Sequence, residues 1–370
     1  MIGFSSPYFQ KQLKIAFEII DNYSFNEPFH IHLKKKFQQN KNWGSKDRKN
    51  YRNICYTILR NYPLLKDLDI ENRIQTFQNI ADGDLKFNAF DELAAYIDPS
   101  INSEEVNQSF NHIAPVFFVP YSKPEFLERT DLSKLIGYVG QIKDMDSFIF
   151  DGSSNLDPFV IEKLGYIQDY SSTAAIKRIS KYCNDAVVWD ACCASGGKSL
   201  SVLKFSKPKR HYCSDIRPEI IKNLITRFEL SPYELPETFV LDAHNSSNRD
   251  FKFDNQKNLI IADLPCSGSG NWRRNPENRW TFNESTLVKY QELQRSIFSS
   301  LYSKLPIGGY LYYMTCSIFH AENQGNIKHL QAKHAGLKVE FQEYVGGKIE
   351  CNSTGIYSDY IFGCLVQKTQ

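Results

Sequence analysis

The stretch VVWDACCASGGKSL, residues 187–200, decides the fold of the chain around it. An apolar run ends in Asp190, a turn with two adjacent glycines follows, and a helical pattern begins near Gly197. In open α/β sheets, ligands bind where a strand ends and a helix begins, because the first turn of that helix has unpaired N–H groups. Gly196 and Gly197 would let a ligand approach the backbone closely. The stretch therefore predicts a strand, a ligand-binding turn and a helix of an α/β domain.

The same alternation continues through the C-terminal half of the chain. Short apolar runs lie at 186–192, 210–216, 238–243, 258–264 and 309–317, and helical patterns separate several of them. This order predicts a parallel sheet covered by helices on both faces. Two later runs, 337–344 and 358–368, would add two strands to make a seven-stranded, mostly parallel sheet.

The glycine turn does not match either common phosphate-binding pattern. Gly197-Lys198-Ser199 resembles the end of a phosphate loop, but that loop needs a glycine five residues earlier, where this chain has Cys192. The spacing is also not G-x-G-x-x-G. A nucleotide-phosphate site is therefore not expected here.

Three further strands end in acids, at Asp215, Asp242 and Asp263. Asp215 lies 25 residues after Asp190, close to the offset of about 20 residues at which an acid meets ribose hydroxyls. Each acid taken alone could equally be a helix cap or a turn former. Several strand-end acids without a phosphate loop suit a cationic nucleoside, and S-adenosylmethionine fits because its ribose, amines and sulfonium favour acceptors.

Two cysteines, Cys266 and Cys316, follow the fourth and fifth strands. Neighbouring parallel strands would place both thiols over one crevice, although most cysteines are simply small buried hydrophobes. A thiolate is the reactive form, and only a few per cent of a free thiol ionises at pH 7 unless its site lowers the pKa.

A thiol next to a methyl donor suggests chemistry on a pyrimidine. C5 of cytosine is a poor nucleophile, but a thiolate added to C6 turns the ring into an enamine that can attack a methyl group. Asp263 would lie beside the ring and hold its N3–N4 edge. One thiol would form the adduct, and the other would assist its release.

Three stretches carry a resemblance to a known family: DACCASGGKS (190–199), DLPCSGSGNWRRNPENRW (263–280) and YYMTCSIFHAENQ (312–324). They resemble the signature motifs of the NOP/Sun, or RsmB-like, family of S-adenosylmethionine-dependent RNA cytosine-C5 methyltransferases. The segment GYIQDYSS (165–172) resembles the one that precedes the first motif. The resemblance implies a Rossmann-like class I methyltransferase domain.

The resemblance also implies roles for individual residues. Cys316 matches the nucleophile, Cys266 the cysteine that assists product release, and Lys198 a lysine close to the target base. Asp215 would take the ribose, Asp242 the adenine side, and Asp263 would lie at the reacting centre. Arg273, Arg274 and Asn275 would face RNA. The implied cofactor-binding residues are Cys192, Cys193, Ala194, Ser195, Gly196, Gly197, Lys198, Asp215, Asp242 and Asp263.

Some positions depart from the family pattern. Ser195 stands where the family usually has proline, and Cys193 where it usually has alanine. Both glycines and the lysine remain, so we expect cofactor binding to survive. The usual R-V-N strand of the RNA-binding subdomain is not visible, and FFVPYSK (117–123) stands roughly in its place.

The first 111 residues show helical periodicity, as at 11–23 and 48–68, with Ser45 as a predicted N-cap. The stretch at 43–60 resembles the NusB-like helical domain that precedes bacterial members' catalytic domains. Residues 112–165 are expected to form a small α+β RNA-binding subdomain, with strands near 114–123 and 146–150 and a helix at 123–138. The methyltransferase domain would then span 166–370.

Between His30 and Arg60 the chain is strongly basic, with Asp47 as its one acid. Such a patch could hold an RNA backbone or be a solvated helix face. Its nine cations are Lys34, Lys35, Lys36, Lys41, Lys46, Arg48, Lys49, Arg52 and Arg60.

The whole composition is that of an ordinary globular protein, with 42% hydrophobic and 23% charged residues. The nine cysteines form no C-x-x-C pair, which argues against a disulfide framework and a metal site. Neither a signal peptide nor a bilayer-spanning apolar run is visible, so we expect a cytoplasmic protein with reduced thiols and no membrane partner. A monomer is the default expectation.

Three functions fit these observations to different degrees. The first is RNA cytosine-C5 methylation, with ribosomal RNA expected before transfer RNA because the helical domain resembles the ribosomal type. The second is a catalytically silent RNA-binding assembly factor on the same fold; retention of both Cys266 and Cys316 argues against it. The third, methylation of an exocyclic amine, needs a D/N-P-P-Y-like turn where this chain has DLPC.

Overall fold

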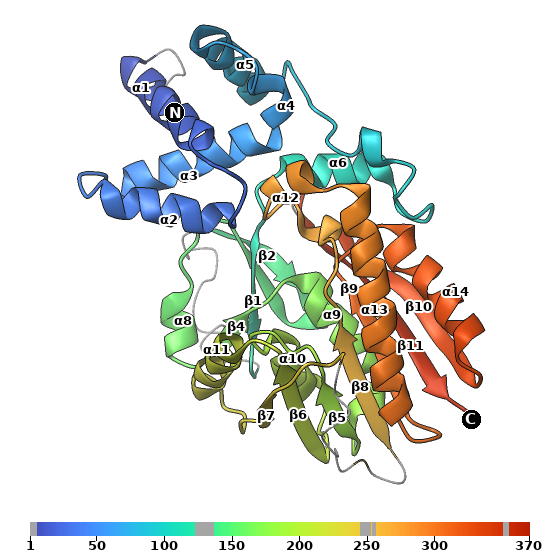
Figure 1. Cartoon of the computed structure of the whole chain (residues 1–370). Helices are drawn as coiled ribbons and strands as arrows, with labels where there is room; N and C mark the ends of the chain where they lie inside the picture. Colours follow the sequence, from blue (N-terminus) through green and yellow to red (C-terminus); the bar gives the residue numbers. More distant parts are fainter. Residues whose placement is uncertain (1–5, 123–136, 245–252, 254–256, 351–354) are drawn as a thin grey trace. The chain divides into compact units, whose positions relative to one another are not determined.

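The protein divides into two compact units in a computed structural model that describes residues 6–122, 137–244, 253, 257–350 and 355–370. The helical unit comprises residues 1–95, 102–113 and 272–282. The sheet unit comprises residues 96–101, 114–271 and 283–370. Figure 1 shows the elements of both units in the colours of the sequence.

The sheet unit contains a seven-stranded sheet with the order β10-β11-β9-β8-β5-β6-β7. The five strands from β5 to β9 run parallel to their neighbours, and β11 pairs antiparallel with both β9 and β10. The expected Rossmann-like α/β class, with a mostly parallel sheet, is therefore confirmed. The strands are β5 (Val187–Asp190), β6 (Arg210–Asp215), β7 (Glu237–Val240), β8 (Asn258–Asp263), β9 (Tyr310–Thr315), β10 (Leu337–Lys348) and β11 (Tyr357–Lys368).

The central strands have side chains buried on both faces. Every residue of β5 is buried, as are nearly all residues of β8 and β9, so these strands appear in the sequence as continuous apolar runs. On one face, α9 (Tyr170–Cys183) and α10 (Gly197–Phe205) share a core with β5, β8 and β9. On the other, α13 (Glu284–Lys304) and α14 (Gln324–Lys333) pack against the same strands (Figure 1).

The order of the strands fixes where a ligand would bind. From β5 the chain moves to β6 and β7 on one side, and it then returns to β8 and β9 on the other. Ligands of such sheets bind outside the carboxyl ends of the strands at this reversal. The crevice between the ends of β5 and β8 is therefore the expected binding place.

A second, four-stranded sheet has the order β2-β3-β1-β4. Its strands are β1 (Val116–Pro120), β2 (Tyr138–Ile142), β3 (Ser147–Phe150) and β4 (Gly165–Ile167), and α8 (Asp157–Ile161) lies between β3 and β4. Val119 of β1 and Tyr166 of β4 pack with Leu200 of α10 and Leu224 of α11 (Pro218–Glu229). This sheet therefore rests on the helices that follow the glycine turn, and β4 continues it beyond the expected boundary at residue 165.

The helix expected at 123–138 falls mostly outside the described residues, because residues 123–136 are not among them. Its last residue, Tyr138, begins β2 and is not helical. Tyr138 pairs with Phe150 of β3, so this end of the segment takes part in the second sheet.

The helical unit contains α1 (Pro7–Asp21), α2 (Phe29–Gln39), α3 (Ser45–Arg60), α4 (Tyr62–Leu65), α5 (Ile70–Asp82) and α6 (Ser103–Asn111). Its core joins one apolar stripe from each of α1, α2, α3 and α5. Ser45 was predicted to be the N-cap of α3, but Gly44 occupies that position. The Asp47 carboxylate accepts a hydrogen bond from the Gly44 backbone N–H at 3.2 Å, so an acid in the first turn caps the helix.

Residues 272–282, far away in the sequence, complete this unit. Trp272 is buried and stacks on Phe90 with 5.5 Å between ring centroids. Within α12 (Glu277–Thr281), Glu277 accepts a hydrogen bond from the Phe29 N–H at 2.9 Å, and Trp280 Nε1 donates to the Leu59 carbonyl at 2.6 Å. The segment directly after the DLPCSGSGN motif is therefore part of the helical core.

Across the residues that the structure describes, no helix has both the length and the apolar character needed to cross a bilayer. The same residues contain no cluster of three or more His, Cys, Asp or Glu side chains with the geometry of a metal site.

Candidate functional site

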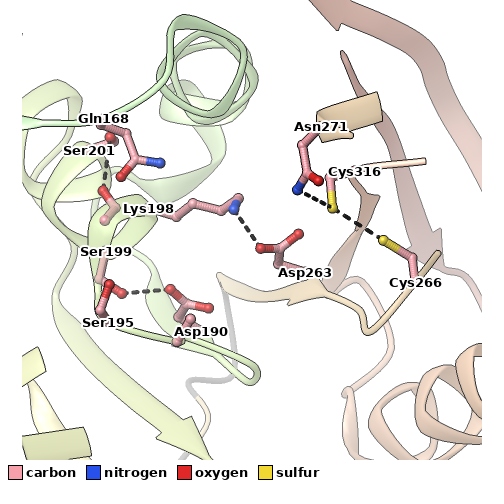
Figure 2. Close-up of polar contacts among 12 residues, drawn as sticks. Gln168, Asp190, Ser195, Lys198, Ser199, Ser201, Asp263, Cys266, Asn271 and Cys316 are labelled. Atoms are coloured by element: carbon pink, nitrogen blue, oxygen red, sulfur yellow. Dashed lines mark hydrogen bonds and ion pairs between the residues drawn. The ribbon is translucent and has the colours of Figure 1, made fainter. Parts of the chain in front are cut away.

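The predicted site residues gather at the carboxyl edge of the seven-stranded sheet. Asp190, Asp215 and Asp263 are the last residues of β5, β6 and β8, and Cys316 directly follows β9. Because these strands are parallel, their carboxyl ends lie along one edge. Figure 2 shows the central part of this edge, where Lys198 and Asp263 point toward each other and the two cysteines lie close to Asn271.

The turn after β5 has a backbone conformation that leaves little room for larger side chains. Ala194 has φ of 46° and Gly196 has φ of 79°, both in the left-handed region. A Cβ on Gly196 would also lie 2.9 Å from Leu224 Cγ, so glycine is required by conformation and by space. The Ala194 N–H donates to Asp215 at 3.1 Å and thereby ties this turn to the end of β6.

Gln168, from the GYIQDYSS segment, lies over the start of α10. A Cβ on Gly197 would meet Gln168 Oε1 at 1.9 Å and Arg227 Nη1 at 2.9 Å. Arg227 also donates to Ser195 Oγ at 3.4 Å. The segment before the first motif therefore contacts the glycine turn itself.

Asp215 is buried and forms an ion pair with the Arg217 guanidinium group. Its carboxylate accepts hydrogen bonds from the Arg217 N–H at 3.0 Å, Arg217 Nε at 2.8 Å and Arg217 Nη2 at 3.0 Å. Burial raises the pKa of Asp215, but the hydrogen bonds from Arg217 outweigh burial and hold the pKa below its ordinary value. Asp242, two residues after the end of β7, accepts a hydrogen bond from the His244 N–H at 2.9 Å.

Asp190, at the end of β5, is a buried acid with an incomplete set of partners. Its Oδ2 accepts a hydrogen bond from Ser199 Oγ at 2.6 Å, whereas its Oδ1 has no hydrogen-bond partner. Burial is the main cause that raises the pKa of Asp190 to about 7. The neutral form is therefore well populated near neutral pH, which the sequence did not indicate.

Lys198 and Asp263 form an ion pair across the reversal point of the sheet. The distance between Lys198 Nζ and Asp263 Oδ2 is 2.5 Å, and the side chains are 15% and 21% exposed (Figure 2). Burial lowers the pKa of Lys198, but the charge of Asp263 and its hydrogen bond outweigh burial and raise it. Lys198 therefore stays cationic where the turn after β5 meets the end of β8.

The two predicted thiols lie next to each other. Cys266 Sγ and Cys316 Sγ are 3.3 Å apart, and Asn271 Nδ2 donates to Cys316 Sγ at 3.5 Å (Figure 2). The hydrogen bond from Cys266 to Cys316, followed by burial, raises the pKa of Cys266 well above its ordinary value. Asn271, at the end of η5 (Ser269–Asn271), was quoted within a motif but had not been identified as a site residue.

Not every predicted residue offers its side chain to this edge. Cys193 is buried in a core with Leu200 and Leu224, and Cys192 packs against the core on the other face. Burial raises the pKa of Cys192. These two positions can contribute backbone groups to a ligand site, but their thiols face the protein interior.

Two arginines expected to contact RNA are buried. Arg273 is 3% exposed, and its carbonyl accepts a hydrogen bond from Arg60 Nη2 at 2.8 Å. Arg60 is 5% exposed and also donates to the Phe110 carbonyl at 2.9 Å. The expectation that Arg273 faces RNA is wrong, and Arg60 does not belong to the basic surface, because both are used inside the helical unit. Arg274 and Asn275 are half-buried.

The remaining cations of α2, α3 and the loop between them stay at the surface. Six of them are exposed, and Lys36 and Arg48 are half-buried. The exposed cations are Lys34, Lys35, Lys41, Lys46, Lys49 and Arg52. The helical unit therefore keeps exposed cations in both helices and in the loop between them, here called the basic face.

The fold and the strand-end loops define a Rossmann-like methyltransferase domain. Among solved structures, that of PH0851 is similar to this chain with a TM-score of 0.72 and 17% identity, over 98% of this chain and 99% of that one. A methyltransferase homolog protein from Pyrococcus horikoshii gives a TM-score of 0.58 with 16% identity, over 84% and 98%. At these identities the likeness shows the fold alone.

The sequence comparisons give the family. Residues 179–358 match the model of the family described as 16S rRNA methyltransferase RsmB/F. The resemblance to the NOP/Sun family is thus confirmed over these residues, which make up just under half of the chain.

Curated relatives named Ribosomal RNA small subunit methyltransferase B are identical to this chain at just over a quarter of the aligned positions. The protein of Shewanella oneidensis is 27% identical over 248 residues, which cover 65% of this chain and 56% of that protein. The protein of Serratia proteamaculans is 28% identical over 177 residues, which cover 47% and 39%. This chain therefore spans about half the length of the curated relatives that it matches, or less.

Proposed function

We propose that this protein is an RNA methyltransferase that transfers a methyl group from S-adenosylmethionine to C5 of a cytosine. The observation that carries this proposal is the pair of thiols, Cys266 and Cys316, whose sulfurs lie 3.3 Å apart beside the Lys198–Asp263 ion pair. Methylation of an exocyclic amine would give neither thiol a role. The match of residues 179–358 to the family model supports the same class of reaction.

The residues around the glycine turn fit the cofactor. The start of α10 offers backbone N–H groups, and the turn leaves no room for a Cβ at Gly196. Asp215 and Asp242 would hold the ribose and the adenine side. The Asp215 carboxylate accepts four hydrogen bonds in this structure, so binding of ribose would replace contacts of the exposed Arg217 side chain. Bound S-adenosylmethionine supplies an electrophilic methyl group.

Cys316 is the proposed nucleophile. Its Sγ lies 3.3 Å from Cys266 Sγ and accepts a hydrogen bond from Asn271 Nδ2 at 3.5 Å. The raised pKa of Cys266 keeps that thiol protonated and able to donate a proton, which suits a proton carrier.

The Cys316 thiolate forms a bond to C6, and the electron pair of the C5–C6 double bond becomes available at C5. C5 then takes the methyl group. The former bond between that methyl group and the sulfonium sulfur breaks, and its electron pair stays on that sulfur. A base removes the proton from C5, the C5–C6 double bond forms again, and the bond between C6 and Cys316 breaks to return the thiolate. We assign assistance of this last step to Cys266.

Asp263 and Lys198 would hold the base during these steps. Asp263 would accept from, or share a proton with, the N3–N4 edge of the cytosine. Lys198 keeps its charge through its ion pair with Asp263 and stabilises negative charge on the ring. The target cytosine must be unpaired, because a stacked base cannot present C6, and flipping costs a few kcal/mol.

Ribosomal RNA is the proposed substrate, and transfer RNA is the alternative. The relatives named Ribosomal RNA small subunit methyltransferase B support the first. The basic face of α2 and α3 would bind phosphates without reading sequence.

The test is methyl transfer from labelled S-adenosylmethionine to unmodified total RNA, to isolated ribosomal RNA and to transfer RNA, with the labelled nucleoside identified after digestion. We expect label in 5-methylcytidine, no label with Cys316→Ala, and a covalent protein–RNA adduct that accumulates with Cys266→Ala. Label in another nucleoside, or full activity of Cys316→Ala, would contradict the covalent mechanism. Tight RNA binding without label on RNA or on ribosomal particles would instead favour the silent assembly factor.

A further inference from the structure

Glu322 is a completely buried acid that lies beside both cysteine loops. It ends the short helix η6 (His320–Glu322), six residues after Cys316, and its exposed fraction is 0%. A carboxylate so far from solvent is stable only when donors surround it. The identity of those donors indicates what this residue does.

Four hydrogen bonds reach the two carboxylate oxygens of Glu322. Oε1 accepts from the Ser267 N–H and from Gln294 Nε2, each at 2.9 Å. Oε2 accepts from Ser267 Oγ and from Ser317 Oγ, each at 2.5 Å. Ser267 directly follows Cys266, and Ser317 directly follows Cys316. One carboxylate therefore holds the neighbours of both thiols.

Further contacts join the same two loops around this acid. Ser269 Oγ and Ser317 Oγ are 3.1 Å apart, and the Gly270 N–H donates to the Cys316 carbonyl at 2.9 Å. Gln294 of α13 donates to the Pro265 carbonyl at 2.9 Å as well as to Glu322. Glu322 is thus the charged centre of a buried network, whereas the other members are neutral.

We propose that Glu322 is a positioning residue for the thiol pair: it holds the Cys266 loop against the Cys316 loop so that both sulfurs face one point. Its catalytic consequence rests on the proposed function, but its geometric consequence does not. Loss of Glu322 would remove the acceptor that Ser267, Ser317 and Gln294 share and separate the two loops. The cofactor-binding turn lies on other strands and would stay intact.

The conservative variant is informative because of the kinds of donor involved. In Glu322→Gln, the amide oxygen can still accept from the Ser267 N–H and from Gln294. The amide NH2 group would then face two hydroxyls, which can turn to accept. This variant therefore keeps the shape of the network without its charge, whereas Glu322→Ala removes both.

Asn326 provides a matched control. It is equally buried, and it donates to Gln294 Oε1 at 2.7 Å and accepts from Arg295 Nε at 2.7 Å. Its side chain has no recorded hydrogen bond to residues 265–270 or 315–317, all of which the structure describes. Asn326→Ala would thus report the cost of losing a buried polar side chain of the same network.

The experiment compares wild type, Glu322→Ala, Glu322→Gln and Asn326→Ala by three measurements. The first is the Kd for S-adenosylmethionine, and the second is kcat for RNA methylation. The third is the rate at which diamide oxidises the two thiols to a Cys266–Cys316 disulfide, followed by peptide mass spectrometry. This last measurement needs neither RNA nor methyl transfer, so it tests the positioning role even if the proposed function fails.

For Glu322→Ala we expect a Kd within about twofold of wild type and a loss of about 100-fold in kcat, because displacement of reacting groups by about 1 Å has effects of this size. Disulfide formation should slow by about tenfold, because it requires close and oriented sulfurs. Glu322→Gln should retain most of the wild-type kcat and most of the wild-type rate of disulfide formation. Asn326→Ala should stay within about threefold of wild type in both.

Wild-type rates of disulfide formation in Glu322→Ala would overturn the proposal. Equal losses in Glu322→Ala and Asn326→Ala, with cofactor binding lost in both, would overturn it too, because they would show a role in folding alone. If Glu322→Ala does not fold, Ser267→Ala removes one hydrogen bond from the Cys266 loop and leaves the acid in place. Unchanged disulfide formation in that variant would likewise count against the proposal.

Discussion

The two halves of the sheet's carboxyl edge are built in different ways. On the side of β5 and β6, the glycine turn and Asp215 lie within about one strand–helix–strand unit, and the turn is tied to the acid by one backbone hydrogen bond. On the side of β8 and β9, Cys266 and Cys316 are 50 residues apart, and a buried carboxylate joins their loops. The first half is a local structure, and the second depends on long-range contacts.

This difference predicts which kind of substitution should impair each half. A local turn responds to changes in its own backbone, and its failure should appear in cofactor affinity. A pair of loops joined by buried hydrogen bonds responds to changes in neighbours that never touch the substrate, and its failure should appear in the chemical step. The Lys198–Asp263 ion pair connects the halves, so its loss should affect both.

The largest effect is expected for Asp263→Asn. Asp263 holds the charged Lys198 beside the proposed place of the base, and removal of one such electrostatic contact to a reacting group lowers kcat about 100- to 1000-fold. We therefore expect a fall of roughly 1000-fold in single-turnover methyl transfer, with weaker cofactor binding.

The control for Asp263→Asn is the more exposed pair of Arg178 Nε and Glu343 Oε1, which are 2.9 Å apart. Glu343→Gln should change neither the rate of methyl transfer nor cofactor binding measurably, because surface ion pairs contribute little to stability. Near-normal methyl transfer by Asp263→Asn would show that the ion pair does not connect the two halves functionally.

A smaller effect, confined to the thiol half, is expected for Gly270→Ala. The added Cβ would lie 2.6 Å from the Tyr360 carbonyl oxygen and 3.0 Å from that of Cys316, and neither backbone group can move aside easily. We expect kcat to fall about 100-fold, as for other displacements of about 1 Å, while the Kd for S-adenosylmethionine stays unchanged.

Gly140→Ala is the matched control for Gly270→Ala, because a Cβ on Gly140 meets nothing within 4 Å and its φ is not in the left-handed region. Gly140→Ala should leave both kcat and the Kd for S-adenosylmethionine at wild-type values. A Gly270→Ala protein that loses cofactor affinity but keeps kcat would reverse the division proposed between the halves.

For Asp215→Ala we expect the reverse of the Gly270→Ala result, with weaker cofactor binding and no change at the thiol pair. Loss of the carboxylate should raise the Kd for S-adenosylmethionine by roughly 10- to 100-fold, because hydrogen bonds to a charged group contribute about 1.5–3 kcal/mol. Calorimetry measures this change directly. Formation of the Cys266–Cys316 disulfide by diamide should proceed at the wild-type rate, and a clear decrease would show that the halves are not independent.

The smallest effect concerns Asp190 and the pH dependence of stability. Its pKa of about 7 in the folded protein lies above the ordinary value of 3.8, so the folded state retains a proton that the unfolded chain releases. The contribution of Asp190 to the free energy of unfolding is therefore largest below pH 4 and decreases as pH rises through 7. Between pH 6 and pH 8 this linkage amounts to about 1.4 kcal/mol.

Asp190→Asn removes that linkage, so its stability should decrease less than that of the wild type between pH 6 and pH 8. Denaturant unfolding at the two pH values measures the difference. The exposed acid Glu229, changed to Gln, serves as the control and should behave like wild type. Parallel pH dependence of Asp190→Asn and wild type would mean that Asp190 is ionised in the folded protein across this range.

The sequence predicted the sheet well because its signals are local. Each apolar run that ended in an acid became a strand with that acid at or just beyond its end, as at Asp190, Asp215 and Asp263. The position of the N-cap of α3 was wrong by one residue, because Asp47 and not Ser45 provides the capping group. Such errors arise where two local signals compete at a helix end.

The sequence also indicated which residues would gather at the carboxyl edge. Parallel strands necessarily bring their ends together, so Lys198, Asp263, Cys266 and Cys316 could be placed near one another before any contact was known. Their proximity in the structure agrees with that placement, whereas their chemical roles stay predictions.

Only the tertiary structure decided how these residues are held and which neighbours are available. It assigned residues 272–282 to the helical core, buried Arg60 and Arg273, turned the Cys193 side chain inward and placed Glu322 between the cysteine loops. Periodicity and spacing describe which face of an element is apolar, and they contain no information about which distant segment covers that face. By itself, the sequence determined the strands, the turn and the chemical groups of this edge; long-range packing determined the network that aligns the two thiols.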